Sequence, residues 1–116
     1  VVSDGEARRI PVGSILYIEK TKRGSRLTVE AGAAGGRNTL QSNERLEDWY
    51  VQLCAQGFEY AHTSYIVNLR AVTKIMQNEL TMSNGDRLGI SRTCSKKFHQ
   101  SFSMYFHKKY KRGGKE

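Results

Sequence analysis

The sequence contains little cysteine, one proline and no long hydrophobic run. Cys54 and Cys94 stand alone among its 116 residues, without the paired spacing of a zinc site or a redox motif. We therefore expect two reduced thiols in the core, with a disulfide as the alternative. No apolar stretch approaches the roughly 20 residues that a membrane-spanning helix needs, and no signal peptide is visible at Val1. These absences favour a cytoplasmic protein.

Acidic residues are scarce in the second half of the chain. Residues 1–58 hold 8 Lys and Arg against 7 Asp and Glu, whereas residues 59–116 hold 11 against 4, within a net charge of +8. A chain of this length is expected to form one domain. Its basic surplus favours a polyanionic partner, either nucleic acid or an acidic membrane or protein surface.

The residue patterns of common enzymes are also missing. His62, His99 and His107 lie in three different settings, and the last two are too far apart on a helix to hold one metal ion. No nucleophile elbow, phosphate-binding loop or paired-cysteine motif occurs. We therefore expect no enzymatic activity, no metal, no cofactor and no small-molecule substrate.

Short strands are predicted first, over residues 7–12, 14–21, 25–32 and 37–42. Alternating apolar residues such as Leu16 and Ile18 are typical of strands with one buried face. The glycine-rich residues 31–36 predict a hairpin loop. A helix is predicted over residues 43–57, with Asn43 as N-cap and Gly57 as left-handed C-cap.

Five further short strands are predicted between residues 58 and 91, and Asn84-Gly85 indicates a hairpin turn between the last two. A second helix is predicted over residues 91–111, with aromatic residues at helical spacing along one face. The sequence therefore predicts a mainly β fold with two helices. Its domain covers residues 1–110, and residues 111–116 form a basic, disordered tail.

Three polar or basic clusters occupy the ends of these elements. They are "KTKRGSR" at 20–26, "AHTS" at 61–64 and "SRTCSKK" at 91–97. The third places cations near a helix N-terminus, where the helix dipole disfavours them, so it indicates an anionic ligand. Each cluster alone could be a solvated loop. Single-stranded RNA binding is disfavoured, because the strands lack interleaved aromatic and basic residues. The final helix could alternatively lie on an anionic membrane.

The order and spacing of these motifs resemble the LytTR DNA-binding domain, the output domain of a class of bacterial response regulators. The "HTSYIVNL" and "ISR" segments carry most of this resemblance. The matching positions extend over nearly the whole chain: 15–19, 46–53, 58–69, Val72, Ile75, Leu80, 84–85, Leu88, 90–92, Phe98 and Phe102.

The resemblance implies an elongated sandwich of short antiparallel sheets, whose inter-strand loops read the major grooves of double-stranded promoter DNA. The base-reading residues that it implies are Arg23, Ser25, His62, Thr63 and Arg92. The implied phosphate contacts are Lys20, Lys22, Arg26, Ser64, Lys96 and Lys97, and Asn68 is expected to stabilise a turn. Two copies on repeated half-sites and an upstream receiver or sensor domain are also implied. The alternative is a basic module that meets an acidic protein or membrane surface.

Overall fold

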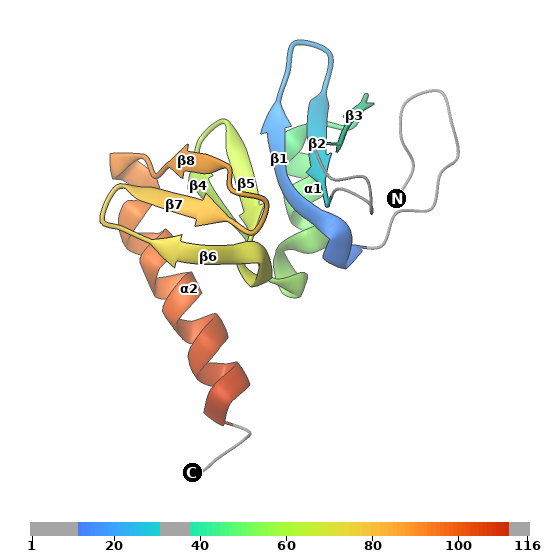
Figure 1. The fold of residues 1–116 in the computed structure, drawn as a ribbon. Helices are drawn as coiled ribbons and strands as arrows, with labels where there is room; N and C mark the ends of the chain where they lie inside the picture. The colour runs from blue at the N-terminus through green and yellow to red at the C-terminus, as the bar shows by residue number, and fades with distance from the viewer. Residues whose placement is uncertain (1–11, 31–37, 112–116) are drawn as a thin grey trace.

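The protein folds into two antiparallel sheets and two α-helices (Figure 1). The computed structural model describes residues 12–30 and 38–111, without the side chains of Asn38 and residues 106–111. The five-stranded sheet has the order β3-β2-β1-β5-β4, and the three-stranded sheet has the order β6-β7-β8. The predicted mainly β fold with two helices is confirmed.

The elements of the larger sheet are β1 (Ile15–Lys20), β2 (Ser25–Val29), β3 (Asn38–Ser42), β4 (Phe58–His62) and β5 (Tyr65–Asn68). The smaller sheet holds β6 (Val72–Ile75), β7 (Glu79–Met82) and β8 (Arg87–Gly89). The helices are α1 (Leu46–Leu53) and α2 (Arg92–Lys111), with short 3-10 turns η1 (Val12–Ser14), η2 (Cys54–Gln56) and η3 (Leu69–Ala71).

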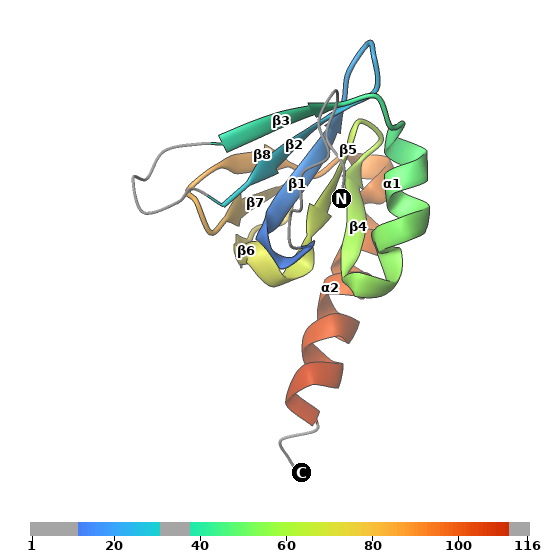
Figure 2. The same cartoon turned by 90° about the vertical axis from the view of Figure 1, so that its right-hand side faces the viewer.

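The five-stranded sheet is buried on both faces, which explains the continuous apolar run of β1. Helix α1 covers one face (Figure 2), where Leu46, Trp49 and Leu53 pack with Ile18 and other sheet residues. On the other face, Leu16 packs in a second cluster with residues of the smaller sheet and α2. The expectation that Leu16 and Ile18 share one buried face was therefore wrong. A register shift between Ile15 and Tyr17 breaks the alternation, so that Leu16 and Tyr17 share one face of the sheet while Ile15 and Ile18 lie on the other.

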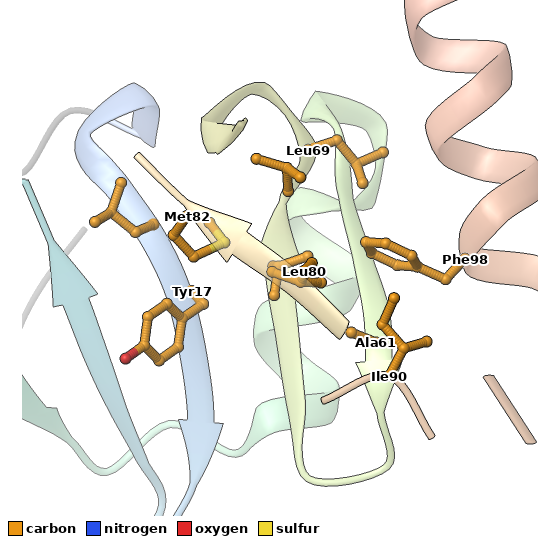
Figure 3. Packing of buried hydrophobic residues seen from close by; sticks show 10 residues of the cluster. Tyr17, Ala61, Leu69, Leu80, Met82, Ile90 and Phe98 are labelled. Atoms are coloured by element: carbon orange, nitrogen blue, oxygen red, sulfur yellow. The ribbon is translucent and has the colours of Figure 1, made fainter. Parts of the chain in front are cut away.

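The second cluster holds the two sheets and α2 together. Figure 3 shows Tyr17, Leu80, Ile90 and Phe98 among its members, so β1, β7 and the start of α2 meet in one apolar layer. At its border, Tyr17 donates a hydrogen bond of 2.7 Å to Asp86. Burial and this neighbouring carboxylate raise the pKa of Tyr17 to about 12.

Several boundaries differ from the sequence-based prediction. Helix α1 begins at Leu46, with Arg45 rather than Asn43 as its N-cap, because residues 43–44 form a bend after β3, in which Glu44 N–H donates a hydrogen bond to Ser42 Oγ. Gly57 has the predicted left-handed conformation, with φ of 96°, but it ends η2. Cys54 is exposed and Cys94 half-buried, so neither is a core thiol, and both are free.

The remaining predictions concern segments that lie partly or wholly outside the described residues. Within the predicted strand over residues 7–12, Val12 belongs to η1, and the rest lies outside the described residues. The predicted glycine-rich loop lies outside them too. Helix α2 extends to Lys111, one residue into the predicted tail, and residues 112–116 are also outside the described range.

Candidate nucleic-acid interface

The β1–β2 hairpin ends in a two-residue turn that carries two cations. Thr21 and Gly24 exchange both backbone hydrogen bonds, with N···O distances of 3.1 and 3.4 Å, so Lys22 and Arg23 occupy the turn itself. Both side chains are exposed. Gly24 makes this geometry feasible, because a Cβ there would lie 2.4 Å from the backbone oxygen of Ser42. The turn therefore presents Lys22 and Arg23 beyond the end of the sheet.

The β4–β5 hairpin also ends in a two-residue turn. His62 pairs with Tyr65 across the strands, which leaves Thr63 and Ser64 at the tip, with Thr63 exposed. The His62 ring stacks on Tyr65, with ring centroids 5.0 Å apart, and its Nδ1 accepts a hydrogen bond of 3.0 Å from Ser64 N–H. Neutral His62 in this arrangement carries its proton on Nε2, which makes Nε2–H a hydrogen-bond donor.

The third predicted cluster lies where β8 leads into α2. Ser91 caps the helix, because its Oγ accepts a hydrogen bond of 3.3 Å from Cys94 N–H. Arg92 is the first helical residue, and its side chain is exposed, as are those of Lys96 and Lys97. Arg92 and Lys96 are four residues apart and so share one face of the helix.

Backbone hydrogen bonds join these three segments along one side of the molecule. Lys20 N–H donates to the Ser64 carbonyl at 2.8 Å, and Ser91 N–H donates to the Ala61 carbonyl at 2.8 Å. The Tyr65 hydroxyl also donates to the Gly89 carbonyl, and burial raises the pKa of Tyr65, which keeps this donor protonated. In Figures 1 and 2, both hairpin turns lie at the end opposite the C-terminal end of α2.

The structure presents most of the predicted contact residues to solvent. Arg23, Thr63 and Arg92 are exposed, and His62 is half-buried. Among the predicted phosphate contacts, Lys20, Lys22, Lys96 and Lys97 are exposed and Ser64 is half-buried. Arg26 is exposed on β2 but forms an ion pair with Glu19, with an N···O distance of 3.3 Å.

The prediction that Ser25 reads a base is wrong. Its side chain is 0% exposed, so it cannot read a base in this conformation. Its hydroxyl donates to the Glu44 carbonyl at 2.8 Å and accepts from Trp49 Nε1 at 2.8 Å. Ser25 is therefore a structural link between the β1–β2 hairpin and α1. Asn68 fulfils its predicted role, because its buried side chain bonds Arg70 N–H and the Ile15 carbonyl.

Arg45 was not among the DNA contacts predicted from the sequence. This exposed residue precedes α1, and it lines a pocket of about 240 Å³ together with the tip of the β1–β2 hairpin. The available signal was an arginine directly before a helix start, where a cation has no stabilising role.

The described part of the chain contains neither a metal-binding cluster nor a membrane-spanning helix. Residues 12–30 and 38–111 contain no cluster of three or more His, Cys, Asp or Glu residues that could hold a metal ion. Across the same residues, neither helix combines the length and the apolar character needed to cross a membrane.

Comparisons with known proteins agree with this fold. Residues 5–103 match the family model of the LytTr DNA-binding domain. The fold is similar to a solved LytTr DNA-binding domain from Bacillus cereus, assigned to a methyl-accepting/DNA response regulator, with a TM-score of 0.72 and 20% sequence identity. This similarity covers 85% of the present chain and 90% of the other. No curated protein matches the chain. Since the family model spans most of the sequence, the chain belongs to the LytTr DNA-binding domain family.

Proposed function

We propose that this domain recognises a specific sequence of double-stranded promoter DNA. In the full-length protein it would be the output domain of a bacterial transcription regulator, controlled by a receiver or sensor domain. The observation that carries the proposal is the hydrogen-bonded connection of three polar segments. The bonds from Lys20 N–H to Ser64 and from Ser91 N–H to Ala61 hold both hairpin turns and the start of α2 together.

Base reading is assigned to the exposed ends of these segments. The arginine guanidinium can donate two hydrogen bonds to guanine O6 and N7 in the major groove, and this chemistry suits Arg23 and Arg92. Thr63 can bond a base edge or contact a thymine methyl group. His62 contributes its Nε2–H donor beside Thr63. Because each reader stands on a hydrogen-bonded turn or at a helix start, little backbone conformational entropy is lost on binding.

Phosphate contacts are assigned to the flanking residues. Lys20 and Lys22 precede Arg23, Ser64 follows Thr63, and Lys96 and Lys97 follow Arg92 on α2. Lysine neutralises phosphate charge without reading sequence. Affinity would therefore fall steeply with salt, with a slope of about 0.9 per neutralised phosphate in a plot of log K against log salt concentration. Arg26 is a weaker candidate, because Glu19 already compensates its charge.

Two copies of the domain would bind repeated half-sites on one duplex, in the cytoplasm. This arrangement doubles the number of bases that are read and suits a small domain with only a few reading residues. The predicted half-site spacing is close to a multiple of the helical repeat of DNA, so that both copies lie on the same face.

The decisive experiment is selection of bound fragments from a random duplex pool, followed by fluorescence anisotropy on the enriched sequence. We expect one enriched motif, present as two repeats. An Arg23→Ala/Thr63→Ala/Arg92→Ala variant should lose the preference for that motif. Arg70→Ala/Lys74→Ala, which changes exposed cations outside the three segments, is the control and should keep it. Failure of any motif to emerge would contradict sequence-specific binding.

A further inference from the structure

A pocket of about 240 Å³ lies between the β1–β2 hairpin and the start of α1. It is lined by Lys20, Thr21, Lys22, Arg23, Gly24, Arg45, Leu46 and Glu47. Four of these residues are cationic and one is acidic. Arg45 is 25 residues from Lys20 along the chain, so only the tertiary fold adds its charge to those of the hairpin.

The two walls of the pocket are fixed to each other by buried contacts. The Ser25 hydroxyl bonds the Glu44 carbonyl and Trp49 Nε1, both at 2.8 Å, which joins the hairpin to both sides of the helix start. Gly24 packs against the Ser42–Asn43 backbone so closely that no Cβ would fit there. The four cations therefore lie on backbone segments that are already fixed to each other before any ligand binds.

The positive charge in the pocket is largely uncompensated. Within the described residues, Lys20, Lys22, Arg23 and Arg45 form no ion pair; the ion pair found there joins Arg26 to Glu19. Glu47 offsets one of the four charges. The first turn of α1 carries Glu47 and Asp48, which offset the positive end of the helix dipole, so the attraction of an anion comes from the cationic side chains.

We infer that this pocket binds a phosphate group, and that in the DNA complex this group is a backbone phosphate next to the groove that Arg23 enters. A tetrahedral dianion or diester oxygen suits a site that combines an arginine fork with lysine point charges. Arg45 thereby becomes a phosphate contact supplied by α1, and it positions the hairpin on the duplex. The DNA source of the phosphate rests on the proposed function, whereas phosphate binding itself does not.

The test compares Arg45→Ala with Arg70→Ala, which removes the same charge from an exposed residue outside the pocket. Duplex binding is measured by fluorescence anisotropy from 50 to 200 mM salt, on the selected motif and on a random duplex. We expect Arg45→Ala to weaken both duplexes by a similar factor and to lower the salt slope by about 0.9. Arg45→Lys should restore most of that slope, and Arg70→Ala should leave it unchanged.

A second arm uses inorganic phosphate alone, titrated into the free protein and followed by amide chemical shifts. Saturable shifts of residues 22–24 and 45–47 that disappear in Arg45→Ala support the pocket. Thermal unfolding of each variant shows that it is folded; Arg45 caps α1 through its backbone carbonyl, which alanine retains.

Each other outcome counts against a defined part of the inference. If the wild-type protein binds duplex and Arg45→Ala behaves like Arg70→Ala, the assignment to a DNA phosphate is wrong. If the wild-type protein binds no duplex, the proposed function fails, and the phosphate titration alone decides the pocket. Absence of shifts at residues 22–24 and 45–47 up to high phosphate concentration would overturn it.

Discussion

Trp49 Nε1 donates a hydrogen bond of 2.8 Å to the hydroxyl of Ser25, across 24 residues of sequence. The same hydroxyl donates to the Glu44 carbonyl. Ser25 therefore satisfies the buried indole of α1 and anchors the hairpin that carries Lys22 and Arg23. Ser25, which the family resemblance implied to be a base-reading residue, instead supports the hairpin from beneath.

Replacement of Ser25 by alanine should lower stability rather than change sequence preference. Ser25→Ala leaves the buried Trp49 N–H without its acceptor, which costs about 1–3 kcal/mol in the free energy of unfolding. Urea denaturation measures this loss, and Ser103→Ala, an exposed serine on α2, serves as the control. A fully stable Ser25→Ala protein that had lost discrimination at one base pair would restore Ser25 as a base reader.

Arg92 and Lys96 should affect DNA binding in different ways, although they lie on the same face of α2. Arg92→Ala should cost about 1–3 kcal/mol on the selected motif and relax the preference at one base pair. Lys96→Ala should weaken selected and random duplexes alike, because a lysine contributes mainly phosphate charge. Competition binding with single-base variants of the motif separates the two. Equal losses on all sequences for Arg92→Ala would reassign Arg92 to a phosphate.

Gly24→Ala tests whether the geometry of the β1–β2 hairpin matters for binding, and Gly85→Ala is its control. A Cβ at Gly85 meets no atom within 4 Å, so Gly85→Ala carries only the cost of its φ of 94°, about 1–2 kcal/mol. A Cβ at Gly24 would lie 2.4 Å from the Ser42 oxygen, so Gly24→Ala must also move the hairpin.

The expected result is a larger loss of stability for Gly24→Ala than for Gly85→Ala, measured by thermal unfolding. DNA affinity at a temperature where both are folded should fall for Gly24→Ala alone. Equal affinity for the two variants would show that the position of the hairpin tip does not matter for binding.

Ionisation of Tyr17 should lower the stability of the protein at alkaline pH. Its pKa is about 12 in the folded protein, because burial and Asp86 disfavour the phenolate, and about 10 in the unfolded chain. Between these values the unfolded chain releases the proton while the folded protein keeps it. The contribution of Tyr17 is therefore complete below pH 10 and is lost as the pH rises toward 12.

Urea denaturation at pH 9, 10 and 11 measures this slope. Tyr17→Phe should have a shallower slope, although it also loses the hydrogen bond to Asp86. Tyr50, whose pKa is likewise raised to about 12 by burial and Glu59, keeps part of the slope in that variant. Identical slopes in wild type and Tyr17→Phe would show that the folded state does not protect this phenol.

The sequence predicted local features well. Alternating apolar residues located most strands, helical spacing located α1 and α2, and Gly57 marked the end of a helical segment. It failed at the start of α1, because Asn43 is a favourable N-cap by type, yet the bend at residues 43–44 delays the helix to Leu46. It also failed at β1, where alternation could not show that both faces of the sheet are covered.

Residue order alone shows where polar residues interrupt the apolar pattern, and hence which loops join the predicted strands and helices. Period and residue type act over a few neighbouring residues, so these features can be read directly from the chain. The burial of Ser25 beside Trp49, and the position of Arg45 with Lys22 and Arg23 around one pocket, came from the three-dimensional fold. Burial and charge convergence depend on contacts between distant segments, and no local pattern encodes those contacts.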